Sequence, residues 1–285
     1  MTKGALSSHQ LRHYRQQGFL VLEAFLDAAT LASLRNASAE LVSAFNPAQH
    51  RSVFRTTDQD QGRDETFFRS AEKVEYFLED EALDSNGELT VAAERAVNKI
   101  GHALHDHIPA FRSFCQLPLL AALLKQLGMA HPVLWQTMLI FKQPGIGGEV
   151  RWHQDATYLY TEPSAVMGLW FALEDATRDN GCLWLAPGAH DSPLRERYRV
   201  DWHTRRGTLE TIHEQPWPTV EEAVPLEVPA GSLVLFSDHM PHYSSANRSD
   251  QSRLALTLHA ADRSAHWDAA NWLQRPTLAP FLLGT

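Results

Sequence analysis

The chain has 285 residues, of which 44% are hydrophobic and 21% are charged, so it is long enough to bury the core of one large domain. Its formal net charge of −9 argues against nucleic acid or an anionic membrane as a partner, since both require a concentrated cationic face. Two widely separated cysteines give no indication of a disulfide scaffold or a thiolate zinc site. The sequence has no apolar run typical of a signal peptide or long enough to span a membrane, so we expect a cytoplasmic protein.

Helical signals dominate the first 130 residues. A segment that starts at Ser7 ends at Gly18, and Asp27 can cap a second helix with apolar residues at helical spacing. Between them, residues 19–22 form an apolar run that we interpret as a strand or a packed connector, and the polar stretch 49–69 is predicted to be a long loop. The patterns predict four helices, at about 7–18, 27–45, 90–107 and 116–127.

After Pro132 the pattern changes to short apolar runs, separated by turn sequences such as Pro144-Gly145 and Pro187-Gly188. We predict strands at 133–142, 165–173, 182–185, 226–228, 232–236 and 253–259. Many short strands with this punctuation favour a mixed α+β fold, in which N-terminal helices face a jelly roll or closed double sheet. We expect one domain over 1–285, with a helical part to about residue 130 and a β core over about 131–265.

An HxD motif, His153 and Asp155, is the clearest chemical signal. In an extended strand, residues two apart point to the same face, so this imidazole and this carboxylate can bind one ion. The segment FSDHMPHYS offers two further histidines, His239 and His242, of which we choose His242 as the third ligand. Two imidazoles and one carboxylate leave three positions of octahedral iron(II) open for a chelating 2-oxo acid and dioxygen, whereas zinc sites are usually closed or tetrahedral.

Arg253 follows these ligands at the start of the next predicted strand. Its guanidinium could point into the same barrel and hold a carboxylate through two parallel hydrogen bonds. Considered without the ligands, Arg253 is equally well explained by a surface ion pair, and the HxD motif by a polar pair at a strand end. The combination is therefore what predicts a site for a metal ion and a dicarboxylate.

Five sequence blocks resemble the phytanoyl-CoA dioxygenase family of iron(II)- and 2-oxoglutarate-dependent oxygenases. They occur in the same order over nearly the whole chain, which makes the resemblance specific. It implies a double-stranded β-helix, a cupin-like jelly roll, with flanking N-terminal helices. The blocks are QQGFLVLEAFL, NKIGHALHDH, FKQPGIGGEVRWHQDATYLYTEP, EDATRDNGCLWLAPGAH and HYSSANRSDQSRLALTLH.

The resemblance also implies a set of site residues. The metal ligands fall on His153, Asp155 and His242, and the cosubstrate contacts fall on Lys99, Met138, Trp170, Ser244 and Arg253. Iron(II) and 2-oxoglutarate are then expected, together with a small-molecule substrate and O2, and with succinate and CO2 as coproducts. The ligand His242 is preferred over His239 because the positions of the serine and the arginine fit only from His242. A carboxylate at position 155 disfavours halogenation.

Other residues receive weaker predictions. The substrate side could be lined by Gln136, Trp152, Tyr158 and Tyr160, with Phe54 or Trp202 from loops above it. Simple core packing competes with a pocket role for Met138 and Trp170. We expect His102, His105 and His107 on a solvated or hydrogen-bonded helix surface rather than in a second metal site. We expect His190 and His259 in structural positions or at the pocket edge.

The sequence therefore predicts a hydroxylase that acts on an unidentified small organic or acyl-type substrate. No cationic cluster suited to the phosphates of coenzyme A lies near the motifs, which favours a smaller substrate. Two alternatives use the same fold: a cupin-like metal-dependent hydrolase or isomerase without a cosubstrate, and a binding protein without catalysis. The sequence leaves the oligomeric state open.

Overall fold

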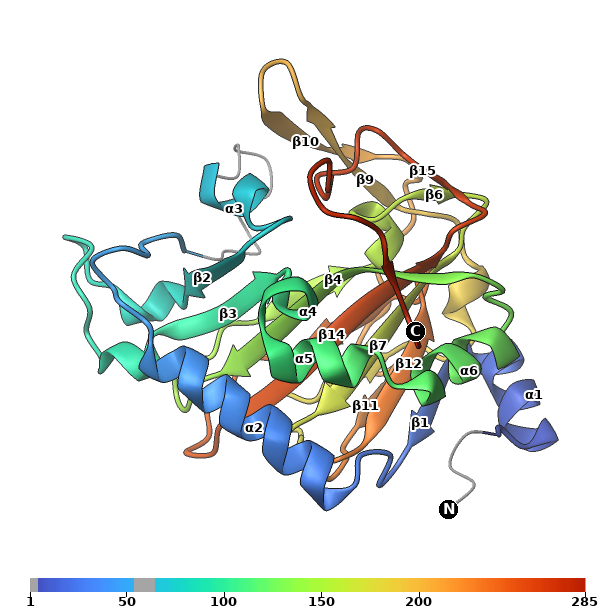
Figure 1. The fold of residues 1–285 in the computed structure, drawn as a ribbon, viewed down its shortest axis with the longest axis horizontal. Coiled ribbons are helices and arrows are strands. Elements are labelled where there is room, and N and C mark those ends of the chain that lie inside the picture. Colours follow the sequence, from blue (N-terminus) through green and yellow to red (C-terminus); the bar gives the residue numbers. More distant parts are fainter. Residues whose placement is uncertain (1–4, 54–64, 285) are drawn as a thin grey trace.

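The computed structural model describes residues 5–53 and 65–284. Its main element is an eight-stranded antiparallel sheet in the order β1-β12-β7-β14-β4-β3-β2, with β16 beside β4 (Figure 1). The strands are β1 (Phe19–Leu22), β2 (Val74–Leu78), β3 (Val97–His102), β4 (Pro132–Lys142), β7 (Val166–Ala172), β12 (Leu233–Ser237), β14 (Arg253–Asp262) and β16 (Phe281–Leu282).

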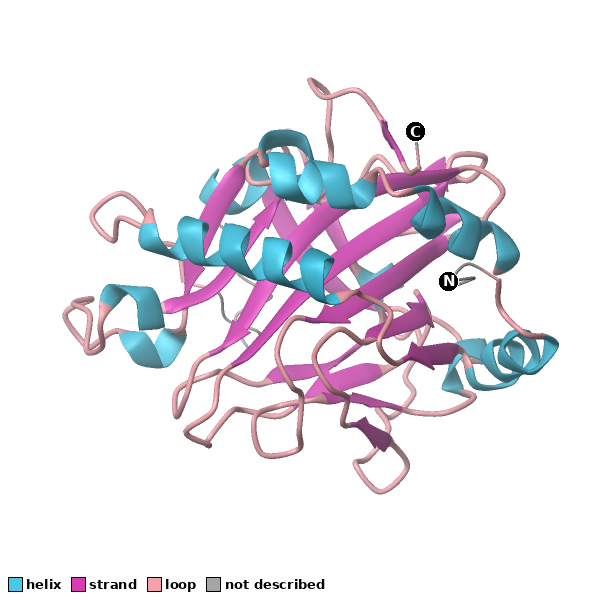
Figure 2. Ribbon diagram, turned by 60° about the horizontal axis from the view of Figure 1, so that its bottom comes forward, coloured by secondary structure: helices cyan, strands magenta, loops and turns pink. Residues whose placement is uncertain are grey.

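A four-stranded antiparallel sheet lies on one side of the large sheet, and helices cover the other side (Figure 2). The strand order of this small sheet is β11-β8-β13-β5. Its strands are β5 (Val150–His153), β8 (Leu183–Leu185), β11 (Val224–Leu226) and β13 (His242–Ser244). Two further pairs join β6 (Thr161–Glu162) to β15 (His266–Trp267), and β9 (Glu196–Asp201) to β10 (Arg206–Thr211). This is the mixed α+β jelly roll that the sequence predicts.

The helices are α1 (Ser8–Gln17), α2 (Ala28–Ser43), α3 (Glu65–Arg69), α4 (Leu104–His107), α5 (Pro109–Cys115) and α6 (Pro118–Gln126). Ser7 and Gln10 form a capping box at the start of α1, and Gly18 ends that helix with a φ of 80° that favours glycine. Asp27 caps α2 by accepting a hydrogen bond from the Thr30 amide at 2.8 Å. None of the helices in the described ranges is long and apolar enough to cross a membrane.

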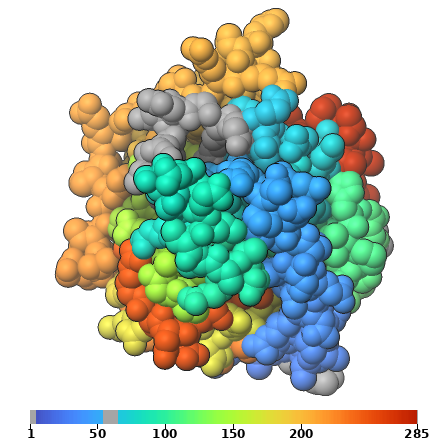
Figure 3. All heavy atoms as spheres, turned by 90° about the vertical axis from the view of Figure 1, so that its left-hand side faces the viewer, coloured from blue at the N-terminus to red at the C-terminus, as the bar shows by residue number. Residues whose placement is uncertain are grey.

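The core lies between the helices and the outer face of the large sheet. Alternate residues of β14, among them Leu256 and Leu258, are fully buried there. The ring of Phe171 on β7 packs against Phe25 and, edge to face at 5.1 Å, against Phe114 on α5. Figure 3 shows the segment around β2 and β3, in teal, beside α2, in blue. The helices and the large sheet are therefore held together by this apolar core.

Three of the expected elements differ from the structure. Residues 90–107 do not form one helix, because Val97–His102 pairs with both β2 and β4 as strand β3, and only Leu104–His107 is α-helical beyond it. Pairing with distant strands overrides the local pattern. The long loop expected over 49–69 ends early, since Glu65–Arg69 forms helix α3, while residues 54–64 lie outside the described ranges. The strand expected at 226–228 is shifted to Val224–Leu226.

Candidate metal centre

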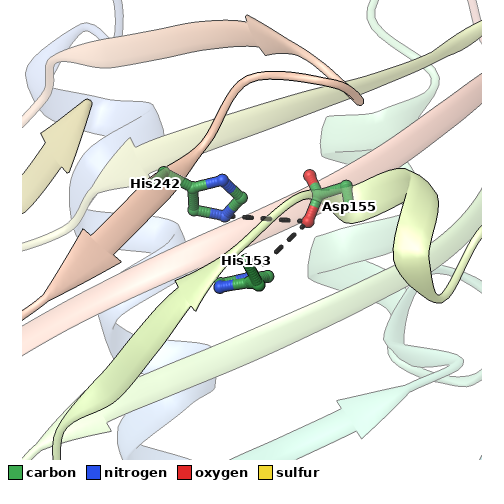
Figure 4. A group of neighbouring side chains, drawn as sticks. All are labelled: His153, Asp155 and His242. Atoms are coloured by element: carbon green, nitrogen blue, oxygen red, sulfur yellow. Dashed lines mark ion pairs between the residues drawn. The ribbon is translucent and has the colours of Figure 1, made fainter. Parts of the chain in front are cut away.

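Two neighbouring strands of the small sheet bring the predicted ligands together. His153 is the last residue of β5 and pairs directly with His242, the first residue of β13. Figure 4 shows both imidazoles turned toward the carboxylate of Asp155. Asp155 Oδ1 lies 3.8 Å from His153 Nε2 and 3.7 Å from His242 Nε2. Across residues 5–53 and 65–284, this is the one cluster of at least three such groups whose ligand atoms all lie within 4.8 Å of one another.

The spacing argument assumed that Asp155 continues strand β5, but it does not. It opens a 3-10 turn, η3 (Asp155–Thr157), and the backbone carbonyl of Asp155 accepts hydrogen bonds from the amides of Tyr158 and Leu159. The turn is anchored by the buried side chain of Gln154, which donates to the His239 carbonyl at 2.9 Å and accepts from the Arg195 amide at 3.0 Å. The carboxylate therefore reaches the histidines from a fixed turn.

Both histidines are prepared as neutral ligands. His153 Nδ1 and His242 Nδ1 each lie 2.9 Å from a backbone carbonyl, of Arg151 and Met240 respectively, which fixes the proton on Nδ1 and leaves a lone pair on Nε2. Burial, with a contribution from His242, lowers the pKa of His153 to about 3, and burial also lowers the pKa of His242. Although burial acts to raise the pKa of Asp155, neighbouring histidines hold it well below its usual range.

A cavity of about 150 Å³ contains the triad. All five residues expected to contact the cosubstrate line its wall: Lys99, Met138, Trp170, Ser244 and Arg253. Arg253 is only 2% exposed, donates to the Ile140 carbonyl at 3.3 Å, and stands 5.6 Å from the centre of the Trp170 ring. No ion pair among the described residues includes Arg253. The cavity thus combines a two-histidine, one-carboxylate cluster with a buried guanidinium that forms no ion pair among the described residues.

The comparison with known proteins decides the family, because the phytanoyl-CoA dioxygenase family model matches residues 14–255. The chain belongs to the phytanoyl-CoA dioxygenase family. Phytanoyl-CoA dioxygenase 1 of Oryza sativa subsp. japonica is 43% identical over 275 residues, which cover 95% of each chain. Phytanoyl-CoA dioxygenase domain-containing protein 1 of Rattus norvegicus is 42% identical over 284 residues, or 97% of each chain. The prediction of a dioxygenase is confirmed.

Solved structures of lower identity share the fold. EctD from S. alaskensis, crystallised with 2-oxoglutarate and 5-hydroxyectoine, has a TM-score of 0.64 at 18% identity, over 99% of this chain and 85% of that one. The non-heme alpha ketoglutarate dependent carbocyclase SnoK has a TM-score of 0.63 at 19% identity, over 99% and 95% of the two chains. The predicted double-stranded β-helix is confirmed.

Lys142 is a feature of this family member that the sequence reasoning missed. Its ammonium is buried at the end of β4 and donates to the carbonyls of Gly148, Ser244 and Ser245 at 2.5, 3.2 and 2.7 Å. Burial, aided by the charge of Arg253, holds its pKa well below the usual range. A lysine at the end of an apolar strand gives no signal of this burial, which depends on the nearby Gly148 carbonyl and on two carbonyls about a hundred residues away in the chain.

The predictions for the substrate side are correct only in part. Gln136 and Tyr158 line the cavity, together with Phe67, Leu159 and Trp272, which the sequence reasoning did not select. Three aromatic residues expected there are not part of the wall. Trp152 stacks on Tyr243, the Tyr160 ring lies under the Arg197 guanidinium, and Trp202 donates to the Ala269 carbonyl. Phe54 lies outside the described residues.

The remaining histidines are mostly structural. His102 ends β3 rather than lying on a helix, lines the cavity, and hydrogen-bonds Ser70 Oγ at 2.7 Å. His105 is fully buried instead of solvated, whereas His107 is exposed. Two others contact residues outside the triad and the cavity wall. A third lies in the cavity wall and contacts the triad. His190 contacts the Arg15 carbonyl, His239 contacts the Ser192 carbonyl, and His259 contacts Asp155.

Proposed function

We propose that the protein is an iron(II)- and 2-oxoglutarate-dependent oxygenase that hydroxylates a small organic substrate, with succinate and CO2 as coproducts. The observation that carries the proposal is the buried guanidinium of Arg253, which has no carboxylate partner among the described residues and lies in the wall of the cavity that holds the triad. A buried cation is costly unless an anion pairs with it. A dicarboxylate bound between Arg253 and a metal ion would supply that anion.

The donor set suits iron(II). His153, Asp155 and His242 would hold the ion through two Nε2 lone pairs and one carboxylate oxygen, and this set leaves coordination positions for a 2-oxo acid and dioxygen. Bound iron(II) supplies the dioxygen activation that couples decarboxylation of 2-oxoglutarate to oxidation of a substrate C–H bond. The protein contributes the fixed turn and the paired strands that orient the three donors.

The charge at the Arg253 end of the cavity favours a dianion. Burial lowers the pKa of Arg253 only to about 10, so the guanidinium remains charged at neutral pH. Lys99 lines the same wall, and Lys142 lies immediately behind it. Glu79 is a buried acid near this end, and burial raises its pKa although the charges of Lys142 and Arg253 act to lower it. Ser244 adds a hydroxyl that can donate to a carboxylate.

The other end of the cavity would receive the primary substrate. Phe67, Tyr158, Leu159 and Trp272 make this part of the wall apolar and aromatic, so they would exclude water from the reacting C–H bond. A wall of this kind suits a small organic substrate. The coenzyme A thioester in the names of the relatives is not required by these residues.

Thermal unfolding separates this function from a cupin-like hydrolase without a cosubstrate, whereas succinate formation separates it from a binding protein. We expect Mn(II) to raise the melting temperature, and 2-oxoglutarate to add a further increase only when Mn(II) is present, because binding to the native state alone stabilises it. Arg253→Met should keep the increase caused by Mn(II) and lose the increase caused by 2-oxoglutarate. Equal responses of wild type and Arg253→Met to 2-oxoglutarate would contradict the proposal.

A further inference from the structure

Three residues lie side by side on the cavity face of the large sheet, one on each of its three central strands. His259 on β14 pairs with Gln136 on β4 and with Gly168 on β7. His259 Nε2 lies 2.9 Å from Asp155 Oδ2, and Gln136 Nε2 lies 2.8 Å from His259 Nδ1. The row therefore ends on the carboxylate of the metal site, although no part of it belongs to the triad.

This contact gives the two carboxylate oxygens of Asp155 different surroundings. Oδ1 faces the Nε2 atoms of His153 and His242, while Oδ2 faces away from them and is hydrogen-bonded to His259. A carboxylate held in this way presents one oxygen to an ion rather than two. Single-oxygen binding keeps a coordination position free that a two-oxygen mode would occupy.

The hydrogen bonds in the row can run in only one direction. An ionised carboxylate accepts but cannot donate, so the shared proton belongs to His259 Nε2. The nitrogen of the Gln136 amide is the atom that faces His259 Nδ1, so the amide donates to this ring nitrogen. This orientation leaves Gln136 Oε1 buried without a hydrogen-bond partner among the described residues. The reversed amide would bury an N–H group at that place and would turn its oxygen toward the Nδ1 lone pair.

Gly168 provides the space that this arrangement needs. A Cβ atom at residue 168 would lie 3.1 Å from Asp155 Oδ2 and 2.8 Å from the Phe236 ring, which is closer than side chains pack. Its strand neighbours Leu169 and Trp170 are large and buried, so a glycine here weakens the strand without a local turn to justify it. The Phe236 ring and the Asp155 carboxylate together leave room only for a glycine.

From this geometry we propose that His259, held in one tautomer by Gln136, is a positioning residue for Asp155. It fixes the carboxylate so that Oδ1 alone binds the metal ion. The inference rests on the metal site proposed above, and it gives Gln136 a different role from the substrate contact that the sequence suggested. Partners of metal ligands commonly change metal affinity by about 10- to 100-fold when they are removed.

The test is Mn(II) binding to the metal-free, full-length protein, measured by calorimetry without any cosubstrate. His259→Phe keeps a ring but removes the donor, and it should weaken Mn(II) binding by about 10- to 100-fold. His259→Gln restores an N–H donor and should recover most of that loss. The same variants loaded with Co(II) report the coordination mode through the visible absorption spectrum, which His259→Phe should change and His259→Gln should largely restore.

Two further variants separate positioning from packing. Gln136→Met leaves the His259 ring in place but releases its tautomer, so it should shift the Co(II) spectrum and weaken Mn(II) binding less than His259→Phe does. Leu258→Ala, on the opposite face of β14, should lower the melting temperature and leave Mn(II) affinity unchanged, since Leu258 is buried in the outer core.

Several results would overturn the inference. Wild-type affinity and spectrum in His259→Phe would do so, and so would equal losses in His259→Phe and His259→Gln, which would show that an N–H donor at residue 259 does not position Asp155. If His259→Phe does not fold, Gln136→Met decides, and an unchanged spectrum and affinity in that variant overturn the proposal. Wild-type protein that binds no Mn(II) would instead overturn the metal site itself, together with this inference.

Discussion

The two faces of the large sheet differ in chemistry although the same strands form both. On the outer face, Leu256 and Leu258 of β14 pack into the apolar core under the helices. On the inner face, the alternate residues Arg253, Thr257 and His259 are buried and polar, and they line the cavity. Buried apolar residues stabilise a fold, whereas buried polar residues cost free energy unless they are paired. The outer face of β14 therefore contributes mainly to stability, whereas its inner face carries the polar residues of the cavity beside the apolar Ala255.

The largest effect that separates the two faces is expected from Asp155→Ala. Without the carboxylate, the two remaining imidazoles should hold iron(II) poorly, and succinate formation from 2-oxoglutarate should fall by more than the roughly 100-fold typical of a lost ligand partner. The melting temperature of the metal-free protein should also fall, because the buried His259 loses its hydrogen-bond acceptor. Succinate formation near the wild-type rate would break the assignment of chemistry to this cavity.

Leu256→Ala should lower stability and leave the chemistry of the cavity unchanged. Leu256 is completely buried on the outer face, so its truncation should lower the free energy of unfolding by about 2–5 kcal/mol. Chemical denaturation measures that loss, while the KM for 2-oxoglutarate should stay at its wild-type value in the fraction that remains folded. A large rise in KM with little loss of stability would show that the two faces are not separable in this way.

A smaller effect follows from the buried histidines of the metal-free protein. The folded state keeps His153 neutral, because burial lowers its pKa to about 3, and burial lowers the pKa of His242 as well. The unfolded chain takes up these protons near pH 6.5. It therefore binds more protons than the folded state below that pH, and stability should decrease as the pH falls from about 6.5 toward 4, by at most about 1.4 kcal/mol per pH unit for each histidine.

Denaturation of the metal-free protein at several pH values measures this slope. The matched control is His153→Gln, which removes one of the two groups and should have a shallower pH dependence. An unchanged slope in that variant would show that other groups control the acid stability.

What the sequence could predict depends on how local the signal is. The strands at 133–142 and 253–259, and the HxD motif, carry their own patterns, so they were predicted close to their observed places. Strand β3 was missed because its pairing with β2 and β4 depends on residues far away in the chain. The hydrogen bond from His259 to Asp155 was missed for the same reason, since it joins a strand to a turn more than a hundred residues earlier.

The central claim is that one cavity holds a metal ion at the triad and a dicarboxylate at Arg253. Its most direct test is an anaerobic titration of the iron(II)-loaded protein with 2-oxoglutarate, followed by visible absorption, since chelation of a 2-oxo acid produces a charge-transfer band. We expect a saturable band in the wild type, the same band at roughly 100-fold higher 2-oxoglutarate in Arg253→Met, as expected for a lost charge-assisted pair, and no band in Asp155→Ala. The absence of a band in the wild type, or equal titrations in wild type and Arg253→Met, would contradict the claim.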